Sequence, residues 1–203
     1  LLWELLLRYC RAVRCGGTFG GKSALSLYHN AMLYCVPLVN PDGADLVAGE
    51  IAPASAEYQS AAAIAENFPA IDFPSGWKAN LQGVDLNLNY PASWEEARRI
   101  KAASGFDRPA PRDFPGERPL DQRETAALAA YTACIRPDIL LAYHTQGRVI
   151  YPGYRDIVPP GAPALAQLFA GASGYAIEDV PPESSNAGFK DWFLQRFHRP
   201  GFT

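Results

Sequence analysis

The sequence predicts one α/β domain in which helices cover a largely parallel or mixed sheet. Segments with helical spacing of apolar residues alternate with short apolar or β-branched segments along the 203 residues. The clearest strand is 139–143, an unbroken apolar or aromatic run typical of a strand buried on both faces. The length favours a single domain, and a hydrophobic content of 48% is enough to fill its core.

The first forty residues predict a helix, a loop, a short helix and a strand. Apolar residues recur at helical spacing over 1–13, and the glycine pair at 16–17 ends that helix. A loop follows, and a short helix is expected at about 23–30. The apolar, β-rich residues 32–39 predict a strand.

A turn and an unusual polar segment mark the middle of the chain. Residues 40–43, Asn-Pro-Asp-Gly, predict a turn because Pro fixes φ and Gly accepts positive φ. An Ala-rich helix is expected at 54–66 and a short helix at 93–103, within a Pro-rich loop region over 91–120. Alternation after Gly83 predicts a short strand. Its polar side chains would share one face: Asp85, Asn87 and Asn89.

The second half continues the alternation. Asp121 and Glu124 have the spacing of a capping box, so a helix is expected from there to about Cys134, before the strand at 139–143. The remaining elements are a strand piece at 149–154, a helix at 163–171, an amphipathic helix at 188–197 and the start of a strand at 201–203.

Charge and hydropathy exclude two classes of partner. The net charge is −3, without the Lys and Arg cluster that phosphate binding needs, so nucleic acid is not an expected partner. No apolar run approaches the ~18 residues of a membrane span.

Cys10, Cys35 and Cys134 lie among apolar residues and are expected to be buried free thiols. Oligomeric state and compartment are not predicted.

His144 is the leading candidate for chemistry because it directly follows the 139–143 strand. Ligands in open α/β sheets bind beyond the carboxyl ends of strands. Taken alone, however, a histidine at such a place is more often structural, and Asp85 and Asn87 could equally form a turn. Lys78, beside Trp77, is by itself more typical of a surface lysine. The sequence contains no HxxH, HExxH, HxxE or GxSxG motif.

Blocks of sequence, taken in order, resemble the zinc carboxypeptidase (carboxypeptidase A/B) family. The blocks are residues 36–43 (VPLVNPDG), 77–80 (WKAN), 83–87 (GVDLN), 143–147 (YHTQG), 188–192 (GFKDW) and 200–203 (PGFT). The nearest likeness is to bacterial peptidases that cleave γ-D-glutamyl-diaminopimelate bonds in cell-wall peptides. In carboxypeptidases proper an arginine follows the GVDLN asparagine. Here Leu88 stands at that position, which favours a γ-glutamyl peptide substrate over simple removal of C-terminal residues.

The resemblance implies a zinc peptidase with a three-layer α/β/α fold of the phosphorylase/hydrolase type and a mixed, mostly parallel central sheet. His144 would be a zinc ligand, and Asp85 would orient another ligand histidine. Lys78 falls at or beside the arginine that stabilises the tetrahedral oxyanion. Asn87 would bind a substrate carboxylate or amide. The loop 181–188 would cover the pocket, with these lining candidates: Glu183, Ser184 and Ser185.

The family's HxxE ligand pair and its general-base glutamate have no counterpart in the sequence. Because a hydrolytic zinc site needs three protein ligands and an open water position, the 203 residues are expected to be an incomplete catalytic domain, truncated at both ends. The longer parent would hydrolyse a peptide or peptidoglycan stem peptide through zinc-activated water, whereas this fragment would be inactive. One alternative is a non-catalytic module that binds wall peptides through Asn87, Lys78 and the 181–188 loop. An unrelated α/β hydrolase is disfavoured because a nucleophile elbow is missing.

Overall fold

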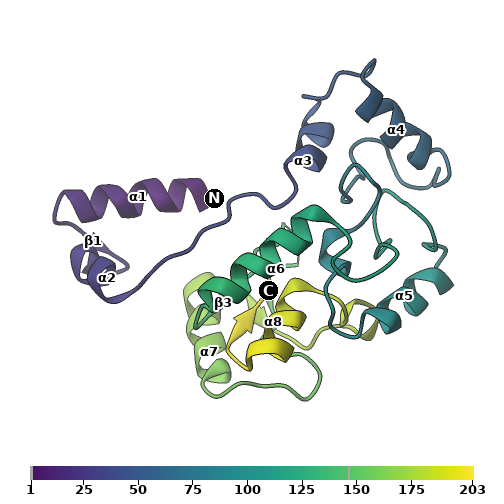
Figure 1. Ribbon diagram of the computed structural model, residues 1–203. Helices are drawn as coiled ribbons and strands as arrows, with labels where there is room; N and C mark the ends of the chain where they lie inside the picture. The colour runs from purple at the N-terminus through teal and green to yellow at the C-terminus, as the bar shows by residue number, and fades with distance from the viewer. Residues whose placement is uncertain (1, 146) are drawn as a thin grey trace. The chain divides into compact units, whose positions relative to one another are not determined.

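The computed structural model describes residues 2–145 and 147–203, apart from the side chain of Glu183. The chain folds into two compact units, Leu1–Val39 and Asn40–Thr203. Both contain helices and short strands (Figure 1). The fold is therefore mixed α/β, as predicted, but it is mostly helical and its strands are two residues long. The single incomplete domain stays a prediction.

The N-terminal unit is a helix, a small hairpin and a second helix. Helix α1 spans Leu2–Arg14, the antiparallel hairpin joins β1 (Thr18–Phe19) to β2 (Lys22–Ser23), and α2 spans Ala24–Asn30. The Ser23 hydroxyl accepts a hydrogen bond from the Ser26 N–H and so caps α2. Both predicted helices are confirmed.

The predicted strand at 32–39 is wrong. These residues form no strand, and most of their large apolar side chains are exposed, including Met32 at 77%. A strand needs a neighbour whose N–H and C=O groups pair with its own, and β-rich composition alone supplies none.

The residues 40–43 begin a helix, so the prediction of a turn is corrected. Helix α3 spans Pro41–Ala48, with Pro41 at its first position, where a missing N–H costs nothing. Asn40 caps it by accepting a hydrogen bond from the Gly43 N–H at 3.1 Å, and its amide donates to the Ala79 carbonyl at 2.9 Å. A side chain at Gly43 would collide with both partners, so glycine is required.

The alternating segment after Gly83 is also not a strand. Leu86–Leu88 form a 3-10 helix (η1), which Asp85 caps. The three polar side chains therefore do not share a face: Asp85 is half-buried, Asn87 is exposed and Asn89 is fully buried. Local hydrogen bonding by Asp85 competes successfully with the extended conformation.

Three helices of the second unit match their predicted places. Helix α4 spans Ala56–Ala65 and is capped by Ser55, α5 spans Trp94–Ala103, and α6 spans Arg123–Ile135. The capping box at α6 is wrong, because Gln122 is the N-cap residue. Asp121 instead accepts hydrogen bonds from the backbone N–H groups of Glu117 and Arg118.

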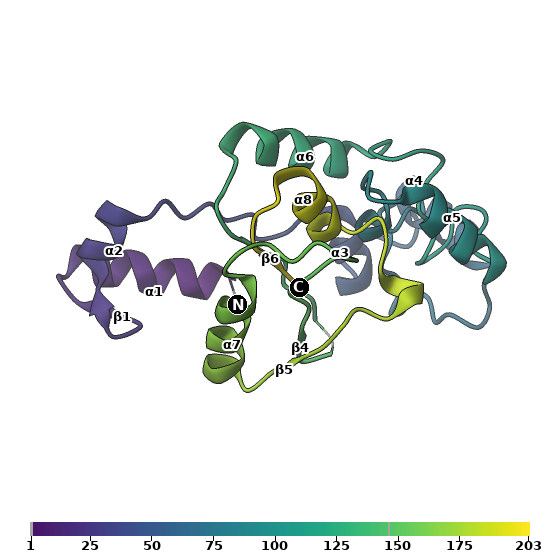
Figure 2. The ribbon, with the colours of Figure 1, turned by 90° about the horizontal axis from the view of Figure 1, so that it is seen from below.

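The remaining strands pair in parallel and are covered by two helices. Strand β3 (Leu140–Leu141) pairs with β6 (Gly201–Phe202), and β4 (Val149–Ile150) pairs with β5 (Ala176–Ile177). The Tyr151 N–H donates to the Thr203 carbonyl at 3.0 Å and so links the two pairs. Helix α7 (Ala162–Ser173) packs on β4 and β5, and α8 (Phe189–Phe197) packs on β3 and β6 (Figure 2).

The largest apolar core lies around α8. It joins the aromatic side chains of that helix to residues of α6 and of the loops: Tyr90, Ala92, Ala129, Tyr154, Trp192, Phe193 and Leu194. A second cluster packs α3 and α4 against the segment around Trp77. The second unit therefore has the buried apolar surface that stabilises a fold.

Two burial predictions are wrong. The strand at 139–143 is not buried on both faces, because Ile139, Leu141 and Tyr143 are exposed. Cys10 and Cys134 are exposed and Cys35 is half-buried, although all are free thiols as predicted. None of the helices in the described residues is long and apolar enough to cross a membrane.

Candidate functional site

The fold brings three of the predicted residues together from three separate segments. Lys78 lies in the loop before η1, Asp85 caps η1, and His144 follows β3. Both charged side chains lie close enough to His144 to act on its pKa. Candidates that are 59 and 66 residues from the histidine in sequence therefore share its surroundings.

His144 is exposed as a residue, yet the protein around its imidazole disfavours the charged form. Desolvation lowers the pKa of His144 below its usual 6.5. The negative charge of Asp85 opposes that shift, and the positive charge of Lys78 adds to it. The balance favours the neutral imidazole, which is the form that binds metals and accepts protons.

Asp85 is held by two backbone N–H groups. One carboxylate oxygen, Oδ1, accepts from the Asn87 N–H at 3.2 Å, and the other, Oδ2, accepts from the Asp113 N–H at 3.2 Å. Burial nevertheless raises the pKa of Asp85, because desolvation outweighs these hydrogen bonds and the charge of Asp113 adds to it. Both carboxylate oxygens are thus fixed in direction close to His144.

Lys78 is exposed, and its backbone is fixed by the segment 111–114. The N–H groups of Lys78 and Ala79 both donate to the Pro111 carbonyl, at 2.8 and 2.9 Å. The Asp85 N–H donates to the Phe114 carbonyl at 2.8 Å, so the same segment also anchors the turn that carries the carboxylate. Sequence reasoning missed this segment, because its contribution is made by backbone atoms.

Asn87 lies beside the start of α8. Its side-chain oxygen accepts from the Phe189 N–H at 3.2 Å, and this hydrogen bond spans 102 residues of sequence. A helix N-terminus leaves several N–H groups without helical partners, and Asn87 satisfies one of them. The same hydrogen bond fixes the orientation of the exposed Asn87 side chain, and therefore the direction of its NH₂ group.

The candidates in the 181–188 loop differ in what the structure shows. The Glu183 side chain lies outside the described part of the chain. Ser184 is exposed, and the Ser185 hydroxyl donates to the Pro182 carbonyl at 3.0 Å.

Sequence reasoning missed the polar anchor of this loop, Asn186. Its side-chain oxygen accepts from the Arg155 guanidinium at 2.9 Å and from the Tyr154 hydroxyl at 3.4 Å. The Tyr154 hydroxyl oxygen also lies within hydrogen-bond distance of the Ser93 hydroxyl, at 2.9 Å, and can accept from it. No sequence signal distinguishes Asn186 from an ordinary loop asparagine.

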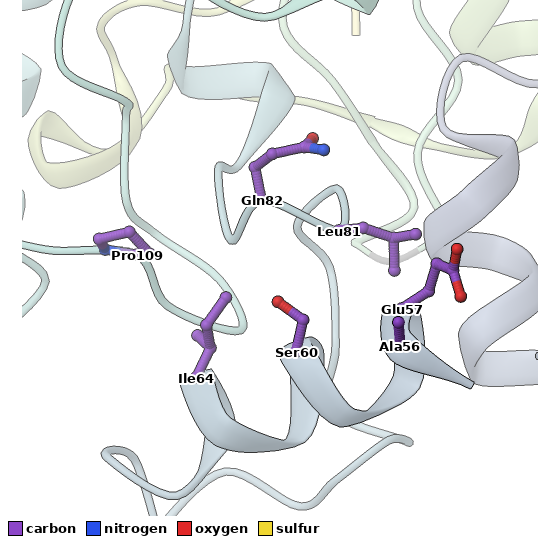
Figure 3. A pocket seen from close by; sticks show the side chains of 7 residues that line it. All are labelled: Ala56, Glu57, Ser60, Ile64, Leu81, Gln82 and Pro109. Carbon is purple, nitrogen blue, oxygen red and sulfur yellow. The ribbon is translucent and has the colours of Figure 1, made fainter. Parts of the chain in front are cut away.

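Two open pockets of the second unit lie away from these residues. One shallow pocket of about 540 Å³ is formed by α4, Leu81, Gln82 and Pro109, as Figure 3 shows. Another, of about 530 Å³, is lined by Pro91, Trp192, Gln195, Arg196 and His198. Neither includes a predicted site residue, so the candidate site is defined by the grouping of side chains and not by a cavity.

The described residues do not fit a zinc ion by themselves. No three His, Cys, Asp or Glu side chains among them are grouped as a metal site. Zinc in peptidases needs three protein ligands, and His144 with Asp85 supplies at most two side chains of ligand type. We therefore derive no catalytic step through a metal on the described residues.

Comparison with known proteins adds what the geometry alone does not give. The family described as zinc carboxypeptidase matches residues 1–189. The chain is 41% identical over all its 203 residues to "Gamma-D-glutamyl-L-diamino acid endopeptidase 1" of Lysinibacillus sphaericus, of which it covers 49%. It is 37% identical over the same length to "Uncharacterized protein YqgT" of Bacillus subtilis (strain 168), of which it covers 52%. The chain thus spans about half the length of these relatives.

Proposed function

Because the chain belongs to the zinc carboxypeptidase family, we propose that it forms part of a catalytic domain that hydrolyses γ-D-glutamyl amide bonds in bacterial cell-wall peptides. The substrate class follows the name of the 41% identical relative, a γ-D-glutamyl-L-diamino acid endopeptidase. Leu88, which replaces the arginine expected in carboxypeptidases proper, supports the same substrate class. The three-layer α/β/α architecture with one central sheet belongs to this proposal.

The observation that carries the proposal is the grouping of His144, Asp85 and Lys78. A neutral imidazole, a carboxylate with fixed oxygens and a cation share one neighbourhood. A hydrolytic zinc site uses a neutral imidazole as ligand and a cation for the developing oxyanion, and the grouping contains both.

Each side chain has a distinct proposed role. His144 is one zinc ligand in the longer protein, and Asp85 orients a neighbouring ligand. Lys78 stabilises the negative charge that develops on the carbonyl oxygen of the scissile amide, where a fixed cation lowers the barrier. Asn87 binds a carboxylate or amide of the peptide, and Ser184 and Ser185, with Glu183, line the covering loop.

The test uses the full-length parent protein and two substrates. We expect hydrolysis of a γ-D-glutamyl-diaminopimelate peptide, and slower or no release of the C-terminal residue from an ordinary peptide. Lys78→Met should lower kcat by about 10²–10³-fold, the usual effect of removing a group that stabilises an oxyanion. Lys22→Met, a change at an exposed lysine of the N-terminal unit, serves as the matched control.

The outcomes separate the candidates. A parent protein that binds the γ-D-glutamyl peptide without cleaving it would instead support the non-catalytic binding module. Cleavage that is unchanged in Lys78→Met would remove the proposed role of that lysine. For the purified 203-residue chain we expect neither turnover nor one zinc ion per molecule, and observing both would overturn that expectation.

A further inference from the structure

We propose that Asp113 is a positioning residue for the candidate site: its side chain is locked by ion pairs so that its backbone N–H holds the Asp85 carboxylate beside His144. This inference rests on the proposed function for its meaning, since the site matters only if the longer protein is a hydrolase. Asp113 and its ion-pair partners, Lys101 and Arg112, are singled out neither by the motifs nor by the family resemblance.

The first step is the pair of ion pairs at the Asp113 side chain. Lys101, in the last turn of α5, approaches Asp113 Oδ1 at 2.6 Å, and Arg112 approaches Oδ2 at 2.7 Å. The Lys101 and Asp113 side chains are only 14% and 17% exposed, so water screens their interaction little. Asp113 is consequently tied to a helix and not only to its own loop.

The second step is the backbone conformation that these ion pairs hold. Asp113 has a φ of 66°, in the left-handed region that residues other than glycine rarely adopt. Such a conformation persists only where surrounding contacts fix it. Here it turns the N–H of Asp113 toward Asp85 Oδ2, and the next residue, Phe114, accepts from the Asp85 N–H.

The third step is the effect on the turn that carries Asp85 and Asn87. Asp85 receives one hydrogen bond from its own turn, by the Asn87 N–H, and one from Asp113. Of these two hydrogen bonds between described residues, the second joins the carboxylate to a separate segment. Without it, Asp85 could rotate on its turn, and the charge close to His144 would move.

Nuclear magnetic resonance on the 203-residue chain tests the proposal without any metal or substrate. In Lys101→Met we expect the backbone amide hydrogens of Asp113 and Asn87 to exchange with solvent about tenfold faster. The segment can then open locally without breaking the ion pair between Lys101 and Asp113. The imidazole ¹⁵N signals of His144, recorded at one pH, should shift in the direction seen in Asp85→Asn. Lys101→Arg should restore both properties.

A matched control separates positioning from loss of stability. Arg98→Met also breaks an ion pair between α5 and the following loop, that of Arg98 with Glu117, but it leaves Asp113 alone. It should change neither the two amides nor His144, and the exchange of the buried Leu194 amide should be equal in all variants. Unchanged Asp113, Asn87 and His144 signals in Lys101→Met would overturn the proposal.

Steady-state kinetics of the full-length parent protein provide an independent test. Lys101→Met should lower kcat while leaving KM nearly unchanged, and Lys101→Arg should recover kcat. If the wild-type parent shows no hydrolysis, the proposed function fails, yet the resonance experiment still decides whether Asp113 positions Asp85. If the parent is active and kcat is unaffected by Lys101→Met, the positioning role fails alone.

Discussion

Helices α1 and α8 come from the same kind of sequence pattern but differ in what they bury. Both present apolar residues at helical spacing. Helix α1, in the N-terminal unit, buries no residue, and Trp3 and Leu7 are mostly exposed. Helix α8, in the second unit, buries Trp192, Phe193 and Leu194. Amphipathic spacing therefore predicts that a helix forms, but not that a core covers its apolar face.

The largest effect should come from truncating the aromatic centre of the α8 core. Phe193 is fully buried and packs on Phe197 with ring centroids 5.1 Å apart. Phe193→Ala should lower the free energy of unfolding by about 3–5 kcal/mol, since it removes buried surface and leaves a cavity. Denaturant unfolding followed by tryptophan fluorescence measures it.

The matched variant in the other unit is Leu7→Ala, which removes an apolar side chain that is 52% exposed. We expect a change within about 0.5 kcal/mol, as for most surface substitutions. Equal losses from the two variants would show that α1 is packed as tightly as α8, and the comparison would no longer hold.

A smaller loss is expected at a buried polar centre of the second unit. The Asn89 amide donates to the carbonyls of Pro115 and Arg118 and to Asp121, and its oxygen accepts from the Thr125 hydroxyl at 2.6 Å. Asn89→Ala leaves several of these groups buried without partners and should cost about 2–3 kcal/mol.

Asn30 provides the control for that loss. Its amide donates to the Ser26 carbonyl in an exposed position of α2, where water replaces the lost contact. Asn30→Ala should leave the main unfolding transition unchanged. If Asn30→Ala lowered the free energy of unfolding as much as Asn89→Ala, burial of the asparagine would not determine the size of the effect.

Helix positions and several site residues could be predicted from the sequence, whereas their surroundings could not. The amphipathic segment at 188–197 became α8, because the spacing of apolar residues along a helix is a local property. The strand start at 201–203 became β6, which has a parallel partner in β3. The segment 32–39 failed as a strand, because strand formation depends on a partner elsewhere in the chain. At the site, the motifs identified His144, Asp85 and Lys78, but the supporting groups are backbone atoms of 111–114 with no side-chain signature.

Acid pH should weaken the second unit through Asp121. Burial acts to raise the pKa of this carboxyl, but hydrogen bonds from Gln122, from the Glu117 and Arg118 N–H groups and from Asn89 outweigh it and leave the pKa lowered. A lowered pKa means that the unfolded chain binds the proton more readily, so the stabilisation is present above pH ~4 and is lost as the pH falls through the folded pKa. Asp121→Asn should flatten the acid limb of the stability profile.

The shifted pKa values of Asp85 and His144 should change the stability of the fold at higher pH than Asp121 does. Their effects on stability have opposite dependences on pH. The raised pKa of Asp85 makes stability fall as the pH rises from its usual 3.8 through the folded value. The lowered pKa of His144 makes stability fall as the pH drops below 6.5 toward the folded value. Thermal unfolding of His144→Gln between about pH 5 and 7 should lack the second slope, and an unchanged slope would contradict the assignment.

The smallest effects compare the serine caps of the two units. Ser55 accepts from the Tyr58 N–H at 3.2 Å at the start of α4, and Ser23 accepts from the Ser26 N–H at 3.3 Å at the start of α2. Each serine-to-alanine change should weaken its helix by about 1 kcal/mol, the usual value of an N-cap.

Because α4 packs in a buried cluster with Trp77, Ser55→Ala should lower the midpoint of the main unfolding transition. Because α2 belongs to a separate compact unit, Ser23→Ala should instead speed amide exchange only within 24–30. If both changes moved the main transition equally, the two units would unfold together, and the contrast between α1 and α8 would reflect local exposure within one cooperative structure.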